Sequence, residues 1–104
     1  MAFSIRVGYP MLEFEWDIDK QALNVEKHGV AFSDAVETFG DPSGFEIFDT
    51  NHSLNEERFL WIGKDSLERI LTTWYTRREN KIRIIGSAKL RKFRRLNYEN
   101  SKNS

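Results

Sequence analysis

Four short runs in which apolar and polar residues alternate constrain the fold of this chain more than any other feature. They cover residues 45–48, 58–63, 70–76 and 82–87, and polar or turn-forming segments separate them. Alternation with a period of two is typical of strands that bury one face. Because the connecting segments are short, we expect antiparallel neighbours within one sheet.

An earlier strand and a helix are predicted from residues 12–28. Residues 12–16 alternate apolar and acidic side chains, and Asp17 has a side-chain oxygen suited to capping a helix. The helix is expected to run to about His28 and to end at Gly29, which tolerates a left-handed conformation. One apolar stripe, expected to face the core, consists of Ile18, Ala22 and Val25.

A second helix is expected directly afterwards, with Ser33 as its N-cap and Gly40-Asp41-Pro42 as its stop. Its inward residues should be Ala35, Val36 and Phe39. A basic helix over residues 89–100, with Leu90 and Phe93 inward, should close the fold. The order β-α-α-β-β-β-β-α predicts the α+β class, an antiparallel sheet packed by helices.

The chain length of 104 residues suits one core. We expect a loose extension over residues 1–10, one domain over 11–100 and a frayed tail over 101–104. The true start is left open between Met1 and Met11, since the latter directly precedes the first alternating run.

Several features that the sequence lacks exclude classes of protein and indicate the cellular compartment. The chain has no cysteine, so disulfides and thiolate metal sites are excluded, and a reducing cytoplasm is expected. No apolar run approaches the ~20 residues of a membrane span, so we expect no contact with a membrane. The chain has no P-loop, dinucleotide-binding or nucleophile-elbow motif, and we expect no cofactor.

Charge is balanced overall, with 16 basic and 16 acidic residues, but it is unevenly distributed. From Glu13 to Glu57 twelve residues are acidic and two are basic, whereas from Arg77 to Lys102 ten are basic and two acidic. Such asymmetry points to a polyanion on the basic side and a basic protein partner on the other. A solvated basic face, with no ligand, is an equally good interpretation of the basic half alone.

The chain has two histidines, His28 and His52. His28 titrates near neutrality and could act as acid or base, but a histidine in the last turn of a helix also favours the helix dipole. The capping role is the better supported of the two, and His52 is assigned no role. The two histidines lack the short spacing of a zinc site, so we predict no metal.

Aromatic residues in the strands could stack RNA bases, as Trp61, Trp74 and Tyr75 are placed in period-two runs. Aromatic strand residues are nevertheless more often core than ligand platforms. We expect Trp74 in the core and leave Tyr75 open.

Short matches spread along the chain carry a family resemblance. They are Phe14-Glu15-Trp16-Asp17, Lys20, Asn24, Lys27-His28-Gly29-Val30, Phe32, Ala35, Glu57-Arg58-Phe59, Ile62-Gly63, Tyr75-Thr76, Arg78, Arg83-Ile84-Ile85 and Tyr98-Glu99. In this order and over residues 11–99, the chain resembles the BrnT family, the toxin halves of type II toxin–antitoxin pairs.

The resemblance implies a RelE-like fold and a metal-independent ribonuclease that a small DNA-binding antitoxin holds silent in a hetero-oligomer. One segment departs from the family, whose last strand usually reads Arg-Ile-Ile-Ser-Ala-Arg where this chain has Arg83-Ile84-Ile85-Gly86-Ser87-Ala88-Lys89. Either Gly86 is an insertion and Lys89 replaces the arginine, or the register has no gap and the arginine is lost to Ala88.

The expected reaction is attack of the RNA 2′-hydroxyl on the adjacent phosphorus, which inhibits translation and growth. The candidate catalytic residues are His28 or Glu57 as base or acid, with Arg58, Arg78 and Arg83 stabilising the phosphorane. Residues expected to bind the RNA are Lys27, Thr76, Lys89, Arg91 and Lys92. The alternative is a module that binds nucleic acid or protein through the basic C-terminal face without catalysis.

Overall fold

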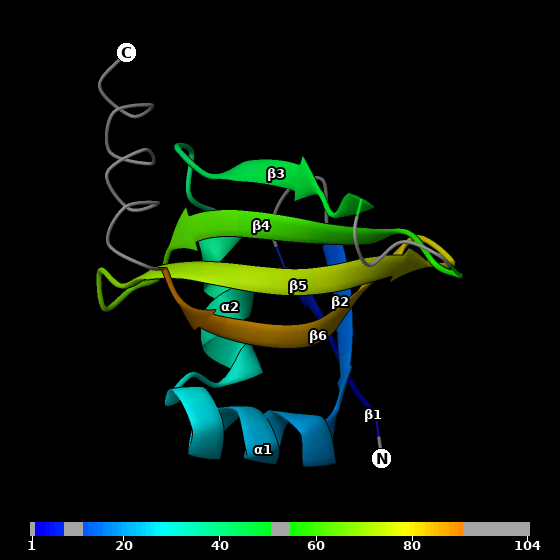
Figure 1. Cartoon of the computed structure of the whole chain (residues 1–104), viewed down its shortest axis with the longest axis horizontal. Helices are drawn as coiled ribbons and strands as arrows, with labels where there is room; N and C mark the ends of the chain where they lie inside the picture. The colour runs from blue at the N-terminus through cyan, green and yellow to red at the C-terminus, as the bar shows by residue number, and fades with distance from the viewer. Residues whose placement is uncertain (1, 8–11, 51–54, 91–104) are drawn as a thin grey trace.

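The computed structural model of the chain describes residues 2–7, 12–50 and 55–90. These residues form six strands and two α-helices in the order β1-β2-α1-α2-β3-β4-β5-β6 (Figure 1). The strands are β1 (Ala2–Val7), β2 (Leu12–Asp17), β3 (Phe45–Phe48), β4 (Arg58–Lys64), β5 (Ile70–Arg78) and β6 (Lys81–Lys89). The helices are α1 (Ile18–His28) and α2 (Phe32–Thr38). The α+β class is thus confirmed.

All six strands belong to one sheet in the order β1-β2-β6-β5-β4-β3. Each of the strands β3, β4 and β5 pairs antiparallel with the next strand, as the short connections predict. The pairing of β2 with β6 is parallel, so the expectation of a purely antiparallel sheet is wrong. Three successive hairpin reversals set the direction of β6, and the two helices carry the chain across from β2 to the far edge.

The first strand lies where a loose extension was expected. β1 pairs antiparallel with β2 over its full length, from Ala2 opposite Asp17 to Val7 opposite Leu12. An unpaired β2 would present a free row of backbone donors and acceptors at the sheet edge, and β1 satisfies them. The expectation for residues 1–10 is therefore wrong over 2–7.

The ends of α1 follow from its sequence. The carboxylate of Asp17 accepts hydrogen bonds from the backbone N–H groups of Asp19 at 2.8 Å and Lys20 at 3.2 Å. The hydrogen bond from Lys20 is the main reason that the pKa of Asp17 lies below its ordinary value. At the other end Gly29 adopts φ 68°, and its N–H donates to Val25 at 2.8 Å. Both predicted caps are confirmed.

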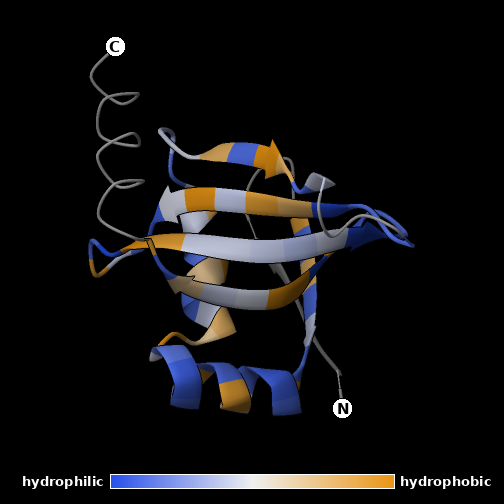
Figure 2. Ribbon diagram, viewed as in Figure 1, coloured by the Kyte–Doolittle hydropathy of each residue, from blue (hydrophilic) through white to orange (hydrophobic). Residues whose placement is uncertain are grey.

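The predicted buried stripe of α1 is wrong. Ile18 and Val25 are 38% and 45% exposed and Ala22 is also exposed, so the outer face of α1 carries apolar side chains among charged ones (Figure 2). The buried residue of this helix is Asn24. Its amide donates to the carbonyls of Val30 and Ser87, both at 2.8 Å, and accepts from the N–H of Ser87 at 3.2 Å. A polar side chain therefore anchors α1 to β6.

Helix α2 supplies the core beneath the sheet. Ala35 and Val36 are buried and Phe39 packs against them, as predicted. They meet Phe14 and Trp16 of β2, Ile84 of β6, and Phe32 at the start of the same helix. The predicted N-cap is wrong, because Ala31 occupies that position and Ser33 lies inside the helix.

The predicted strands agree with β2 to β6 to within two residues at each end. The terminal helix predicted over residues 89–100 is wrong at its first residue, because Lys89 is the last residue of β6. Residues 91–100 lie outside the described part of the chain. Among the described residues no helix has the length and apolarity to cross a membrane.

Candidate active site

Four neighbouring strands place one side chain each in a single row across the sheet. In the register, Glu15 of β2 lies opposite Arg83 of β6, Arg83 opposite Thr76 of β5, and Thr76 opposite Arg58 of β4. Residues directly opposite each other project from the same face, with Cβ atoms ~5 Å apart in antiparallel pairs. We call this set, Glu15, Arg83, Thr76 and Arg58, the arginine row.

The arginine row lies on the face of the sheet away from α2. Its neighbours in sequence, Phe14, Tyr75 and Ile84, point the other way and are buried on the helix side. The helices of the described chain pack on that other side, so neither covers the row (Figure 1). The row therefore lies on what we call the open face.

Within the row, Arg83 and Glu15 form an ion pair whose Nη1–Oε1 distance is 3.6 Å. Their side chains are 23% and 18% exposed, so both reach solvent. The distance is longer than a hydrogen bond, which leaves the guanidinium with donors for an anion. Glu15 orients Arg83 without saturating it.

A second row of charges runs beside the first, where the strands end. Lys81 Nζ lies 3.0 Å from Glu13 Oε2. Arg78, opposite Lys81 in the register, contacts Glu56 through Nε at 2.9 Å and Nη2 at 3.2 Å. This two-point contact matches the guanidinium fork to a carboxylate. Three cations of the two rows, Arg78, Lys81 and Arg83, thus lie around one β5–β6 turn.

The ion pairs of the second row shift the pKa values of the side chains that form them. Hydrogen bonding from Arg78 is the main cause that holds the pKa of Glu56 below its usual range. The same contact raises the pKa of Arg78, and the hydrogen bond to Glu13 raises the pKa of Lys81. Glu56, Arg78 and Lys81 are therefore charged at neutral pH.

Thr76 occupies the middle of the arginine row and is fully buried. Its hydroxyl is close enough to Glu56 to contribute to the low pKa of that carboxyl. It nevertheless makes no hydrogen bond of good geometry to any of the described residues. A buried hydroxyl without a firm partner is uncommon, and between two arginines it is placed to donate to an anion.

Glu57 is exposed and directly precedes Arg58, at the end of the arginine row. The structure thus brings together four of the candidate residues, namely Arg58, Thr76, Arg78 and Arg83, and Glu57 adjoins them in sequence.

Lys27 and His28 lie at the opposite end of the sheet. They occupy the last turn of α1, and the carbonyl of the following Gly29 accepts from Arg69 at 3.3 Å. Arg69 immediately precedes β5, whereas Thr76 lies near the end of that strand. At ~3.3 Å per residue the strand separates Ile70 from Thr76 by about 20 Å. His28 is therefore not beside the arginines with which the sequence pattern grouped it.

Lys89 lies opposite Leu71 and is exposed, at the same end of the sheet as His28. Arg91, Lys92 and His52 lie outside the described residues. Lys27, His28 and Lys89 therefore form a separate basic group near the end of α1.

The carboxylates that pair with the cations were not singled out from the sequence. They are Glu13, Glu15 and Glu56. The alternation of Glu13 and Glu15 with buried aromatic residues was visible, but their partners follow only from the parallel pairing of β2 with β6. No group of three or more potential metal-ligating side chains occurs in residues 12–50 and 55–90. The absence of a metal ion from the reaction stays a prediction.

Comparison with known proteins places this arrangement in a family. A model described as "Ribonuclease toxin, BrnT, of type II toxin-antitoxin system" matches residues 16–93. The crystal structure of the Brucella abortus ribonuclease toxin BrnT is similar in fold, with a TM-score of 0.57 and 20% sequence identity. The similarity covers 74% of this chain and 94% of that one. None of the curated proteins matches the chain. The match over most of the domain shows that this chain belongs to the BrnT family of ribonuclease toxins of type II toxin–antitoxin systems.

Proposed function

We propose that the chain is an endoribonuclease that cuts RNA without a metal ion, and that the open face around the arginine row binds the phosphate at which the cut occurs. The observation that carries this proposal is the register that sets Arg58 and Arg83 on either side of Thr76. Two fixed guanidinium groups and a hydroxyl on one face match the oxygens of a phosphodiester.

The reaction needs a base, charge stabilisation and a leaving group. The 2′-hydroxyl loses its proton to Glu57, and its oxygen bonds to phosphorus while the bond to the 5′-oxygen breaks. The 5′-oxygen takes a proton from solvent, and the product ends in a 2′,3′-cyclic phosphate. Arg58, Arg78 and Arg83 stabilise the charge of the phosphorane, and Thr76 donates to one of its oxygens.

Of the two candidate bases, His28 is disfavoured by its location. It lies about 20 Å from the arginine row, too far to take a proton from the same nucleotide. We therefore propose Glu57 as the base, and assign Lys27, His28 and Lys89 to the RNA strand that flanks the cut.

A cognate antitoxin completes the proposal. Its expected role is to cover the cations of the open face, because these groups meet either phosphates or carboxylates. RNA and the antitoxin would then compete for Arg58, Arg78, Lys81 and Arg83.

Cleavage of a defined RNA by purified protein tests the mechanism. Arg83→Ala and Arg58→Ala are each expected to lower kcat by about 10²–10³-fold, the usual cost of one lost donor at a developing charge. Lys20→Ala, which removes an exposed cation from α1, is the control and should leave kcat unchanged. Full activity in either arginine variant would show that the residue is structural.

Three further measurements test the chemistry. Activity should survive EDTA, and the product should carry a cyclic or 3′-phosphate. Glu57→Gln should lower kcat far more than His28→Gln does. Loss of activity in EDTA that Mg²⁺ restores would overturn the metal-free mechanism, and the reverse order of the two variants would restore His28 as the base.

A further inference from the structure

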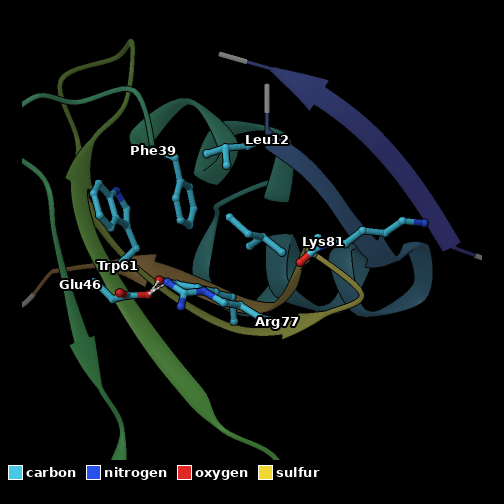
Figure 3. Close-up of a pocket in the computed structure, with 9 residues that line it drawn as sticks. Leu12, Phe39, Glu46, Trp61, Arg77 and Lys81 are labelled. Carbon is cyan, nitrogen blue, oxygen red and sulfur yellow. Dashed lines mark hydrogen bonds and ion pairs between the residues drawn. The ribbon is translucent and has the colours of Figure 1, made fainter. Parts of the chain in front are cut away.

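The helix side of the sheet has a pocket of about 410 Å³ behind the arginine row. Its walls include Phe39, Trp61, Tyr75 and Ile82, and Glu46 and Arg77 form a polar edge (Figure 3). A largely apolar hollow of this size, with a few converging polar groups, is typical of small-ligand sites.

The aromatic wall of the pocket is rigid. The rings of Phe39 and Trp61 stack at 5.1 Å with 12° between their planes, and Tyr75 meets Phe39 edge-on at 5.3 Å. The indole N–H of Trp61 donates to the carbonyl of Thr38 at 2.7 Å. A Cβ at Gly63 would lie 2.6 Å from that same carbonyl, so glycine is needed for this close packing. The wall is therefore formed before any ligand arrives.

The polar edge of the pocket is held by internal bonds. Glu46 Oε1 accepts from the hydroxyl of Tyr75 and from Arg77 Nη2, the latter at 2.6 Å. Burial raises the pKa of Tyr75, so its hydroxyl remains a donor. The guanidinium of Arg77 lies 4.5 Å from the ring centroid of Phe59, which fixes its orientation. Both polar side chains are thus positioned in advance.

The edge still has bonding capacity. Glu46 Oε2 has no hydrogen-bond partner among the described residues, and the side chain is 33% exposed. Arg77 is 56% exposed and retains further N–H donors. An acceptor and a donor side by side complement the edge of a nucleobase, where a ring or amino N–H lies beside a carbonyl or ring nitrogen.

We infer that this pocket binds a purine base of the RNA, an inference that rests on the proposed function. The aromatic wall takes the flat ring system, while Glu46 accepts from a base N–H and Arg77 donates to the adjacent acceptor. The volume accommodates two fused rings, which bury more apolar surface against the wall than a pyrimidine does.

Strand β5 connects the pocket to the proposed cut site. Tyr75 and Arg77 point into the pocket, and the alternating residues Thr76 and Arg78 point to the open face. The RNA would pass the β5–β6 turn, so the recognised base lies a few nucleotides from the cut phosphate. The pocket then sets a base preference at a distance from the chemistry.

Titration with nucleosides tests the pocket without phosphate or cleavage. Adenosine and guanosine should quench tryptophan fluorescence saturably and shift the indole N–H resonance of Trp61, whereas uridine and cytidine should bind at least fivefold more weakly. Glu46→Gln and Arg77→Gln should each weaken purine binding about tenfold, because each removes a hydrogen bond to a charged group. Glu26→Gln removes an exposed carboxylate of α1 and should bind as the wild type does.

Equal affinity for all four nucleosides, no saturable binding, or wild-type affinity in both pocket variants would overturn the inference. Circular dichroism of each variant shows whether it is folded. RNA cleavage is measured separately, so an inactive protein that binds purines refutes only the ribonuclease, and an active one that does not bind them refutes only the pocket. In an active protein, Glu46→Gln should also reduce the purine preference near the cut site.

Discussion

Replacing Asn24 with alanine should be among the most destabilising single changes in α1, although the residue is polar. Its side chain makes three buried hydrogen bonds, to the carbonyls of Val30 and Ser87 and from the N–H of Ser87. At ~1 kcal/mol net for each bond, the loss is about 3 kcal/mol. The backbone groups left without partners make this a lower bound if no water replaces the amide.

A loss of about 3 kcal/mol is large relative to the free energy of unfolding of the whole domain. A domain of this length has a free energy of unfolding of roughly 5–15 kcal/mol, so Asn24→Ala removes a fifth or more of it. Near ~4–8 °C per kcal/mol, Tm should fall by about 12–24 °C. Urea unfolding monitored by circular dichroism gives the free energy, and an unchanged m value would show that both proteins unfold from equally compact states.

The adjacent Leu23 offers a matched control, because it is 64% exposed. Leu23→Ala should change the free energy of unfolding by no more than ~0.5 kcal/mol, although leucine is the more hydrophobic residue. If Asn24→Ala costs less than 1 kcal/mol, or if Leu23→Ala costs more than it does, the amide is not the anchor of α1 and our account of this helix is incorrect.

Two further predictions concern charge. Because the folded pKa of Glu56 is depressed, its pairing with Arg78 stabilises the protein above the unfolded pKa of about 4.5, and this stability is lost as pH falls through the lower folded value. In urea titrations, Glu56→Gln should therefore be less stable than wild type at pH 7 and equal to it at pH 2. A difference in stability that grows toward acid pH would refute the pairing. The rate of antitoxin association, followed by stopped flow, should fall with added salt, because steering charges are screened beyond ~8 Å at physiological ionic strength. It should also fall in the double variant Arg78→Glu/Lys81→Glu, which reverses two of these charges. A wild-type rate in the double variant would place the antitoxin on another surface.

The sequence predicts the strands to within two residues because short apolar runs are separated by polar, turn-forming segments, and in β2 the burial also alternates from residue to residue. The sequence assigns the wrong buried face to α1, because Asn24 makes the contact with β6 and a buried amide has no signature in a hydrophobic pattern. The exposed residues Ile18 and Val25 have the spacing of a core stripe, so periodicity alone assigns the wrong face. The tertiary bonds that decide the orientation of this helix are not visible in local sequence.

The candidate site was predicted in part for a similar reason. Arg58, Arg78 and Arg83 come together because the β4–β5 and β5–β6 hairpins fix their register, which short connections make predictable. The distance of these arginines from His28 depends on where α1 ends along β5. The pairing of Arg83 with Glu15 depends on the parallel contact of β6 with β2, which is distant in sequence. Neither follows from local spacing. Trp74 was expected in the core and is only partly buried, lying close over Gly86.

The irregularity of the last strand bears on the departure from the family pattern. The pairing shifts between Trp74 and Tyr75 of β5. Gly86 lies opposite Trp74 and Ile84 lies opposite Tyr75, so Ile85 is an extra residue with no counterpart on β5. A bulge absorbs one additional residue without moving Arg83 out of its row. The assignment of Lys89 to the place of the family's last arginine stays a prediction.

The parallel pairing of β2 with β6 has a consequence for the timing of activity during synthesis. Glu15 leaves the ribosome early, but its partner Arg83 is translated only after five of the six described strands. A row drawn from strands so far apart in sequence cannot assemble while the chain is growing, since non-local pairing must await its last member. A nascent chain therefore lacks the complete arginine row until β6 has been synthesised, and the ribosome that makes this toxin is not exposed to the assembled row before then.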